Sequence, residues 1–100
     1  PTRGAHDGIV FASRAEARRY GDLKLMEQAG VIRDLVLQPS YDLEVNGTKV
    51  ARYVADFAYW DNERNCAVTE DVKGVKTPAY RLKAKMMRAQ YGIEIVEVQA

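Results

Sequence analysis

Residues 49–60 constrain the fold most strongly, because their side chains alternate in polarity and size as in one long β-strand. Successive side chains of a strand point to opposite faces, so every second residue is expected to meet a common core. The segment follows Asn46-Gly47, a pair typical of a tight hairpin turn, which predicts antiparallel pairing with the residues before it. One predicted face carries Tyr53, Ala55, Phe57 and Tyr59, and the other carries Val54, Asp56, Ala58 and Trp60.

Two helices and further strands are predicted around this segment. Ser13 and Glu16 form a capping-box pattern, which predicts a helix over residues 11–29. Thr77-Pro78 opens a second predicted helix, over residues 78–91. The order helix, three antiparallel strands, helix, strand (αβββαβ) predicts an α/β fold, in which helices flank a mixed four-stranded sheet and the last strand is parallel to the third. The other strands are expected at residues 31–45 with a break at Pro39, at 65–73 and at 93–98.

One hundred residues, of which 47% are hydrophobic and 29% charged, predict a single globular domain. Residues 1–10 are expected as a flexible lead-in with His6 solvated, and residues 11–100 as the domain. The formal net charge of +1 means that any nucleic-acid-binding surface must be a local patch. Cys66 is the single cysteine, which excludes an internal disulfide and fits a reducing compartment. The sequence has no run of about 18 apolar residues and no signal-peptide pattern, so no membrane partner and a cytoplasmic location are expected.

A candidate site for chemistry lies on the predicted strand 65–73. Asp71 and Lys73 are two residues apart and therefore point to the same face, while Asp56 lies on the neighbouring strand, about 5 Å away across the sheet. Two carboxylates and an ammonium are costly to bury unless a metal ion or an anionic substrate pairs with them. Mg²⁺ or Mn²⁺ held by Asp56, Asp71 and the Val72 carbonyl would suit phosphodiester hydrolysis. Lys73 would position or activate water, or neutralise charge on the phosphate.

Each of these residues has a simpler alternative. Asp71 and Lys73 could form an exposed salt bridge, the commonest fate of such a pair, although an acid placed among aromatic residues, as Asp56 is, needs another reason. Glu70 is the reserve acid, because a β-bulge would exchange its face with that of Asp71. Glu16 is explained by capping, but its place on the helix face that packs on the sheet also suits a metal ligand or a supporting role.

Three residues near the second helix are candidates for contact with DNA. Lys76 and Thr77 lie at the helix N-terminus, a natural site for a backbone phosphate. Lys83 lies among apolar residues of the same helix, where it either extends along the helix toward solvent or contacts the active site.

The αβββαβ order, with Asp56 on the second strand and Asp71-x-Lys73 on the third, resembles the PD-(D/E)XK nuclease superfamily. Within it, the chain from Gly8 onward resembles a small phage- and prophage-encoded family carried as a domain of unknown function. Ala55 stands where the name-giving motif has proline. The segments that carry the resemblance are Phe11-Ala12-Ser13-Arg14-Ala15-Glu16-Ala17, Tyr20-x-x-Leu23, Gln38-Pro39, Ala55-Asp56-Phe57, Glu70-Asp71-Val72-Lys73-Gly74, Thr77 and Tyr80-Arg81-Leu82-Lys83.

The resemblance implies a Mg²⁺- or Mn²⁺-dependent endonuclease that acts on DNA, with branched or recombination intermediates of phage DNA as the expected substrate. Asp56 and Asp71 would be metal ligands, Lys73 the catalytic lysine, and Glu16 the first-helix acid that resolvase-like members use beside the metal. A homodimer is one option for the assembly. The alternative is a catalytically inactive nuclease-like fold that serves as a DNA-binding or assembly subunit.

Overall fold

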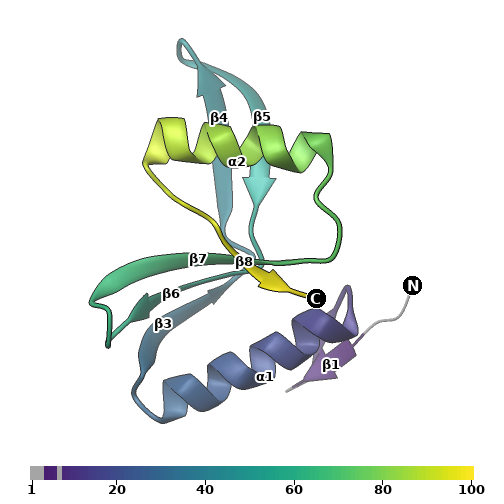
Figure 1. The fold of residues 1–100 in the computed structure, drawn as a ribbon, viewed down its shortest axis with the longest axis vertical. Coiled ribbons are helices and arrows are strands. Elements are labelled where there is room, and N and C mark those ends of the chain that lie inside the picture. Colours follow the sequence, from purple (N-terminus) through teal and green to yellow (C-terminus); the bar gives the residue numbers. More distant parts are fainter. Residues whose placement is uncertain (1–3, 7) are drawn as a thin grey trace.

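The computed structural model describes residues 4–6 and 8–100, and within them the chain forms two helices and eight strands (Figure 1). The helices are α1 (Arg14–Gln28) and α2 (Pro78–Tyr91). The strands are β1 (Gly4–His6), β2 (Ile9–Phe11), β3 (Ile32–Leu37), β4 (Ser40–Val45), β5 (Thr48–Val54), β6 (Phe57–Asp61), β7 (Cys66–Lys73) and β8 (Val96–Gln99).

A mixed four-stranded sheet, in the order β3-β6-β7-β8, lies at the centre of the fold. The neighbours β3, β6 and β7 are antiparallel, and β8 is parallel to β7. The connection from β7 to β8 contains α2, as a crossover between parallel strands requires. The predicted α/β fold is therefore confirmed, including the parallel placement of the last strand.

The prediction of one continuous strand over residues 49–60 is wrong. The chain leaves β5 at Val54 and starts β6 at Phe57, so Ala55 and Asp56 form a break between two separate sheets. At the break, the Ala55 N–H binds the Pro39 carbonyl oxygen at 3.0 Å and the Asp56 N–H binds that of Glu70 at 3.1 Å. As a result β4 and β5 extend away from the four-stranded sheet as a two-stranded ribbon (Figure 1).

The turn of this ribbon was predicted correctly. Asn46 and Gly47 both have positive φ angles, 51° and 81°, as a two-residue hairpin turn of the right-handed twist demands. The alternation of residues 49–60 also holds, because Tyr53, Ala55, Phe57 and Tyr59 are all buried. They are buried in two different cores, however, so an unbroken alternation in the sequence hides the break in the strand.

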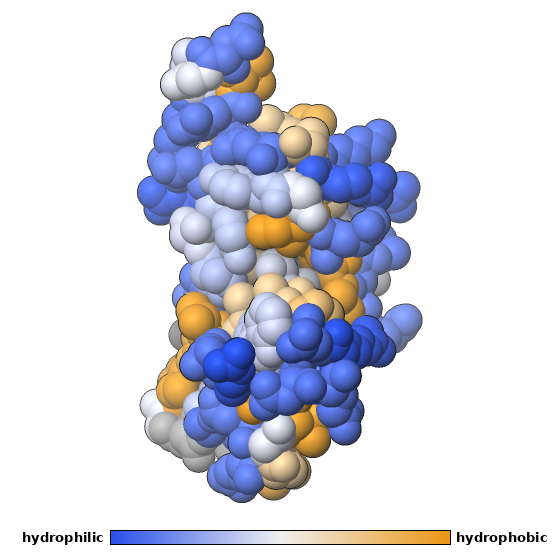
Figure 2. All heavy atoms as spheres, turned by 90° about the vertical axis from the view of Figure 1, so that its left-hand side faces the viewer, coloured by the Kyte–Doolittle hydropathy of each residue, from blue (hydrophilic) through white to orange (hydrophobic). Residues whose placement is uncertain are grey.

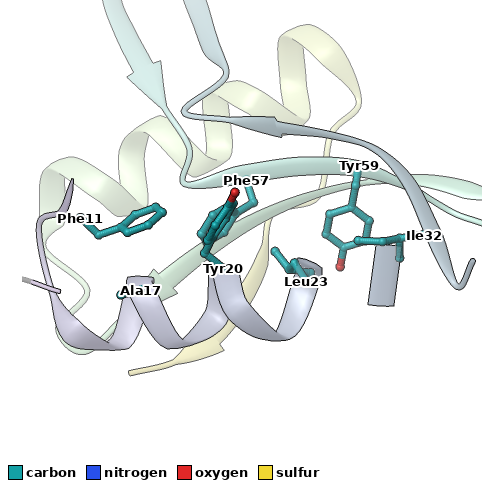
Figure 3. Close-up of a cluster of buried hydrophobic side chains, with 7 residues drawn as sticks. All are labelled: Phe11, Ala17, Tyr20, Leu23, Ile32, Phe57 and Tyr59. Atoms are coloured by element: carbon teal, nitrogen blue, oxygen red, sulfur yellow. The ribbon is translucent and has the colours of Figure 1, made fainter. Parts of the chain in front are cut away.

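The first core lies between α1 and one face of the four-stranded sheet (Figure 3). Leu23 is fully buried there, and the rings of Tyr20 and Phe57 stack with their centroids 6.4 Å apart. Ser13 caps α1 by accepting a hydrogen bond from the Glu16 N–H at 3.2 Å, so the helix begins at Arg14 rather than at residue 11. The buried members of this core are Phe11, Ala17, Tyr20, Leu23, Ile32, Phe57 and Tyr59.

The second core lies between α2 and the β4–β5 ribbon, which the helix crosses in Figure 1. Thr77 caps α2 by accepting a hydrogen bond from the Tyr80 N–H at 3.1 Å, and Gly92 ends it with a left-handed φ of 67°. Both ends of the helix thus agree with the sequence prediction. The buried members are Leu43, Tyr53, Ala55, Tyr80 and Met87.

The chain before α1 contains a short antiparallel hairpin of β1 and β2, where the sequence predicted an irregular lead-in over residues 1–10. Strands of three residues are too short to show a period in the sequence, which is why the hairpin was missed. Residues 1–3 and 7 and the predicted solvation of the His6 side chain lie outside the described residues. None of the described helices is long and apolar enough to cross a membrane.

Candidate active site

The break before β6 places Asp56 beside the C-terminal half of β7. The pairing of β6 with β7 runs without a register shift from Asp61↔Cys66 to Phe57↔Glu70 and stops there. Beyond this point a side chain of the neighbouring segment, and not its main chain, binds β7: Asp56 Oδ2 accepts a hydrogen bond from the Val72 main-chain N–H at 2.7 Å. The N–H and C=O of one strand residue point to the same neighbour, so the Val72 carbonyl also lies toward Asp56.

The carboxyl groups of Asp56 and Asp71 interact directly. The pKa of Asp56 is raised to about 7, chiefly by burial and then by its hydrogen bond with Asp71, while the Val72 N–H opposes the shift. The charges of Asp71 and Glu16 act in the same upward direction. Nearby like charges and burial both favour the protonated form of Asp56, and groups with such a shifted pKa are often found at functional sites.

Two side chains, one polar and one cationic, contact the same carboxylate oxygen of Asp71. The Tyr53 hydroxyl donates a hydrogen bond to Asp71 Oδ2, and Lys73 Nζ lies 3.4 Å from that atom. Lys73 Nζ also lies 4.2 Å from the centroid of the Tyr80 ring, a cation–π contact. Asp71 is only 3% exposed, so the alternative of an exposed salt bridge is wrong: the pair forms, but it is largely buried.

Glu70 lies on the opposite face of β7 from Asp71, as a regular strand requires. Its carboxylate is completely buried and forms a two-point ion pair with Arg19, with distances of 2.8 Å from Nε and 2.6 Å from the terminal nitrogen. The Tyr59 hydroxyl donates to the same carboxylate. Glu70 therefore joins α1 to the sheet instead of serving as the reserve acid of the site. The sequence analysis missed Arg19, although it lies one turn before the buried Leu23 on α1.

Glu16 stands next to the acid pair. It is half-buried in the first turn of α1, and its pKa is raised by burial and then by the negative charge of Asp71. A backbone hydrogen bond at Ala12 and the positive charge of Lys73 lower the pKa again, by smaller amounts. Among the described residues, no three or more His, Cys, Asp or Glu side chains are close enough to hold a metal ion together. Glu16 therefore acts on the acid pair through its charge, and its role as a metal ligand stays a prediction.

The predicted DNA contacts are divided between two places. Lys76 Nζ forms an ion pair with Glu97 Oε1 at 2.7 Å. Thr77 and Lys83 instead line an open cleft of about 350 Å³ beside Lys73, together with Arg52 of β5. The sequence did not single out Arg52 as a site residue. The alternation of side chains along β5 does predict its position, on the exposed face next to the buried Tyr53.

A larger hollow of about 480 Å³ is lined by residues that include Tyr41, Ala58, Thr69 and Ile93, and by none of the predicted site residues. On one face of the molecule, apolar side chains show in the middle as well as in smaller patches near the top and the lower left, among hydrophilic ones (Figure 2). The cleft beside Lys73 is smaller, but two of the residues that line it, Tyr53 and Lys73, contact Asp71.

One family model, described as protein of unknown function (DUF1064), matches residues 3–98. The chain belongs to this family. No curated protein gives a significant match. Because the match spans α1, the break at Asp56, β7 and α2, every residue of the candidate site lies inside the region that defines the DUF1064 family.

The donor set of the site fits a hard divalent cation. Asp56, Asp71 and the Val72 carbonyl supply only oxygen, and Mg²⁺ typically takes one or two carboxylates from the protein and keeps several waters. The Val72 N–H contacts Oδ2 of Asp56, and Tyr53 and Lys73 contact Oδ2 of Asp71. The Oδ1 atom of each carboxylate takes part in none of these three contacts.

Proposed function

We propose that this DUF1064 protein is a metal-dependent endonuclease that hydrolyses DNA phosphodiester bonds, and that it belongs to the PD-(D/E)XK superfamily. The observation that carries the proposal is the position of Asp56 against the buried Asp71–Lys73 pair, at the end of two adjacent strands. An acid, a second acid and a lysine in this order on neighbouring strands are the arrangement that the resemblance implies. A branched or recombination intermediate of phage DNA as substrate, and a bacterial cytoplasm as location, rest on that resemblance.

Asp56, Asp71 and the Val72 carbonyl would hold Mg²⁺ or Mn²⁺. When bound, such an ion acidifies water and stabilises negative charge on a phosphate. Tyr53 fixes the orientation of Asp71 through its hydroxyl, and burial together with that bond raises the pKa of Tyr53, so it remains a proton donor. Lys73 is held between Asp71 and the Tyr80 ring, and its ammonium would neutralise charge that develops on a phosphate bound at the acid pair.

The test is cleavage of supercoiled and four-way branched DNA with Mg²⁺, with Mn²⁺ or with EDTA. We expect cleavage with either ion, none with EDTA, and a loss of about 100-fold or more in Asp56→Ala and Lys73→Ala. Asp22→Ala and Lys85→Ala are matched controls, because both side chains are exposed on helices and lie outside the site. If the parent shows no metal-dependent cleavage, the proposed enzymatic function is wrong. If Asp56→Ala keeps full activity, the proposed active site is wrong.

The alternative is an inactive nuclease-like fold that serves as a DNA-binding or assembly subunit. Binding to DNA in EDTA, combined with no cleavage under any metal, would support this second function over the first.

A further inference from the structure

The open cleft beside the acid pair carries an excess of positive charge. We call it the basic cleft and define it by Arg52 on β5, Lys73 at the end of β7 and Lys83 on α2. None of its described lining residues is acidic. Its volume of about 350 Å³ lies at the lower end of the range of about 300–1,000 Å³ for small-molecule sites, so it suits one unit of a chain rather than several.

The charges of the basic cleft are only partly balanced. Arg52 Nε lies 3.7 Å from Asp42 Oδ1, but Lys49 Nζ lies 3.3 Å from the same oxygen, so one carboxylate serves two cations. The side chains of Arg52 and Asp42 are 58% and 50% exposed, and ion pairs at such exposure are weak. Lys83 is half-buried and forms no ion pair with any described residue. Arg52 and Lys83 are thus available to an anion.

The basic cleft is continuous with the acid pair. Tyr53 and Lys73 line the cleft, and both also contact Asp71, through a hydrogen bond and through the 3.4 Å ion pair. An anionic chain with one phosphate at Asp56 and Asp71 would therefore reach the cleft with its next unit. Val54, which is 48% exposed, adds apolar surface for the sugar.

We propose that the basic cleft binds the backbone phosphate of a DNA strand that flanks the phosphate placed at Asp56 and Asp71. The inference rests on the proposed function, which supplies the first phosphate. It specifies the substrate as a polynucleotide strand held at two successive phosphates, with Arg52 and Lys83 as contacts to the second. These contacts position the strand and carry no information about base sequence.

The experiment measures binding of a dye-labelled single-stranded oligothymidylate by fluorescence anisotropy, in EDTA and over a series of NaCl concentrations. Each cation that neutralises a phosphate of a single strand contributes about 0.7 to the slope of log K against log salt. We expect Arg52→Ala and Lys83→Ala each to reduce the slope by about 0.7, and the double variant by about 1.4. Arg52→Lys should keep the slope, because it keeps the charge.

Arg64→Ala is the matched control, because it removes one exposed cation from the turn between β6 and β7, at the other end of the same sheet. Its slope should equal that of the parent. If Arg52→Ala and Lys83→Ala also leave the slope of a folded protein unchanged, the basic cleft is not a phosphate site. Because the assay contains no metal, the proposed nuclease can fail while the slopes change, and it can succeed while they do not.

Discussion

The Asp56 carboxylate accepts the main-chain N–H of Val72 at 2.7 Å, at the point where the pairing of β6 with β7 stops. The Asp56 side chain thus continues the hydrogen bonding to β7 where the main-chain pairing of β6 ends. This bond fixes Asp56 next to Asp71 and ties the geometry of the candidate site to the break between two sheets.

The raised pKa of Asp56 predicts that the protein loses stability as the pH rises. In the folded protein this pKa is about 7, against an ordinary value of 3.8, so between these values the folded state binds more protons than the unfolded state. Stability should therefore fall from about pH 4 to about pH 7 and then level off, and the raised pKa of Glu16 acts in the same direction. Thermal unfolding measured over this pH range, without added metal, checks the trend.

Asp56→Asn should remove most of this pH dependence, because the amide keeps the acceptor for the Val72 N–H and carries no charge. After allowance for solvent at a half-buried group, we expect the variant to exceed the parent by on the order of 2 kcal/mol at pH 8 and to match it near pH 4. Asp22→Asn, an exposed change on α1, is the control and should follow the parent. Parallel profiles for parent and Asp56→Asn would contradict the prediction.

Removing one partner of the Arg19–Glu70 ion pair should destabilise the protein far more than removing both. Arg19→Met leaves the Glu70 carboxylate fully buried with one hydroxyl donor, and the loss of one partner of a buried pair costs about 3–5 kcal/mol. The double variant Arg19→Met/Glu70→Leu removes both charges and should recover most of that loss. Urea unfolding of the parent, of the single variant and of the double variant measures the free energy of unfolding of each. A double variant as unstable as Arg19→Met would show that packing, and not the buried charge, sets the cost.

Gly92→Ala should destabilise the end of α2 by about 1–2 kcal/mol. Gly92 has a φ of 67°, which is strained for a residue with a Cβ atom, yet a Cβ there would meet no atom within 4 Å. The loss of stability therefore comes from the strained backbone conformation and not from a steric clash. Gly74→Ala is the control, because its added Cβ would make an ordinary 3.7 Å contact with the Cβ of Ala100. Equal unfolding midpoints for the two variants would contradict this assignment.

Tyr53→Phe should weaken the site without unfolding the protein. It removes the hydroxyl that donates to the buried Asp71, which costs about 1–3 kcal/mol of stability because the acceptor loses a partner. With one donor fewer to orient Asp71, cleavage by the proposed nuclease should be slower than in the parent. Tyr91→Phe is the control, since it removes an exposed hydroxyl that donates to the Asp42 carbonyl. An unchanged cleavage rate in Tyr53→Phe would show that this hydroxyl does not orient Asp71.

Features that depend on neighbours in the chain were predictable. Ser13 and Thr77 cap their helices through N–H groups three residues on, and Asn46-Gly47 closes a two-residue turn. The faces of β7 were also predicted, because side-chain alternation is a property of the strand itself, and it separates Glu70 from Asp71. Each of these features is decided by sterics and hydrogen bonds within a few residues.

The tertiary structure decided what those local features are used for. The alternation of residues 49–60 is the same whether the strand is straight or broken, so only the packing of Tyr53 and Phe57 into different cores reveals the break at Asp56. Arg19 and Glu70 are 51 residues apart in the chain, and their pairing exists only because α1 packs on that face of β7. The sequence alone therefore determined the two helix caps, the hairpin turn and the alternation of side chains within the strands. The long-range burial of apolar surface determined which acids face each other, because that contribution depends on contacts that no local pattern records.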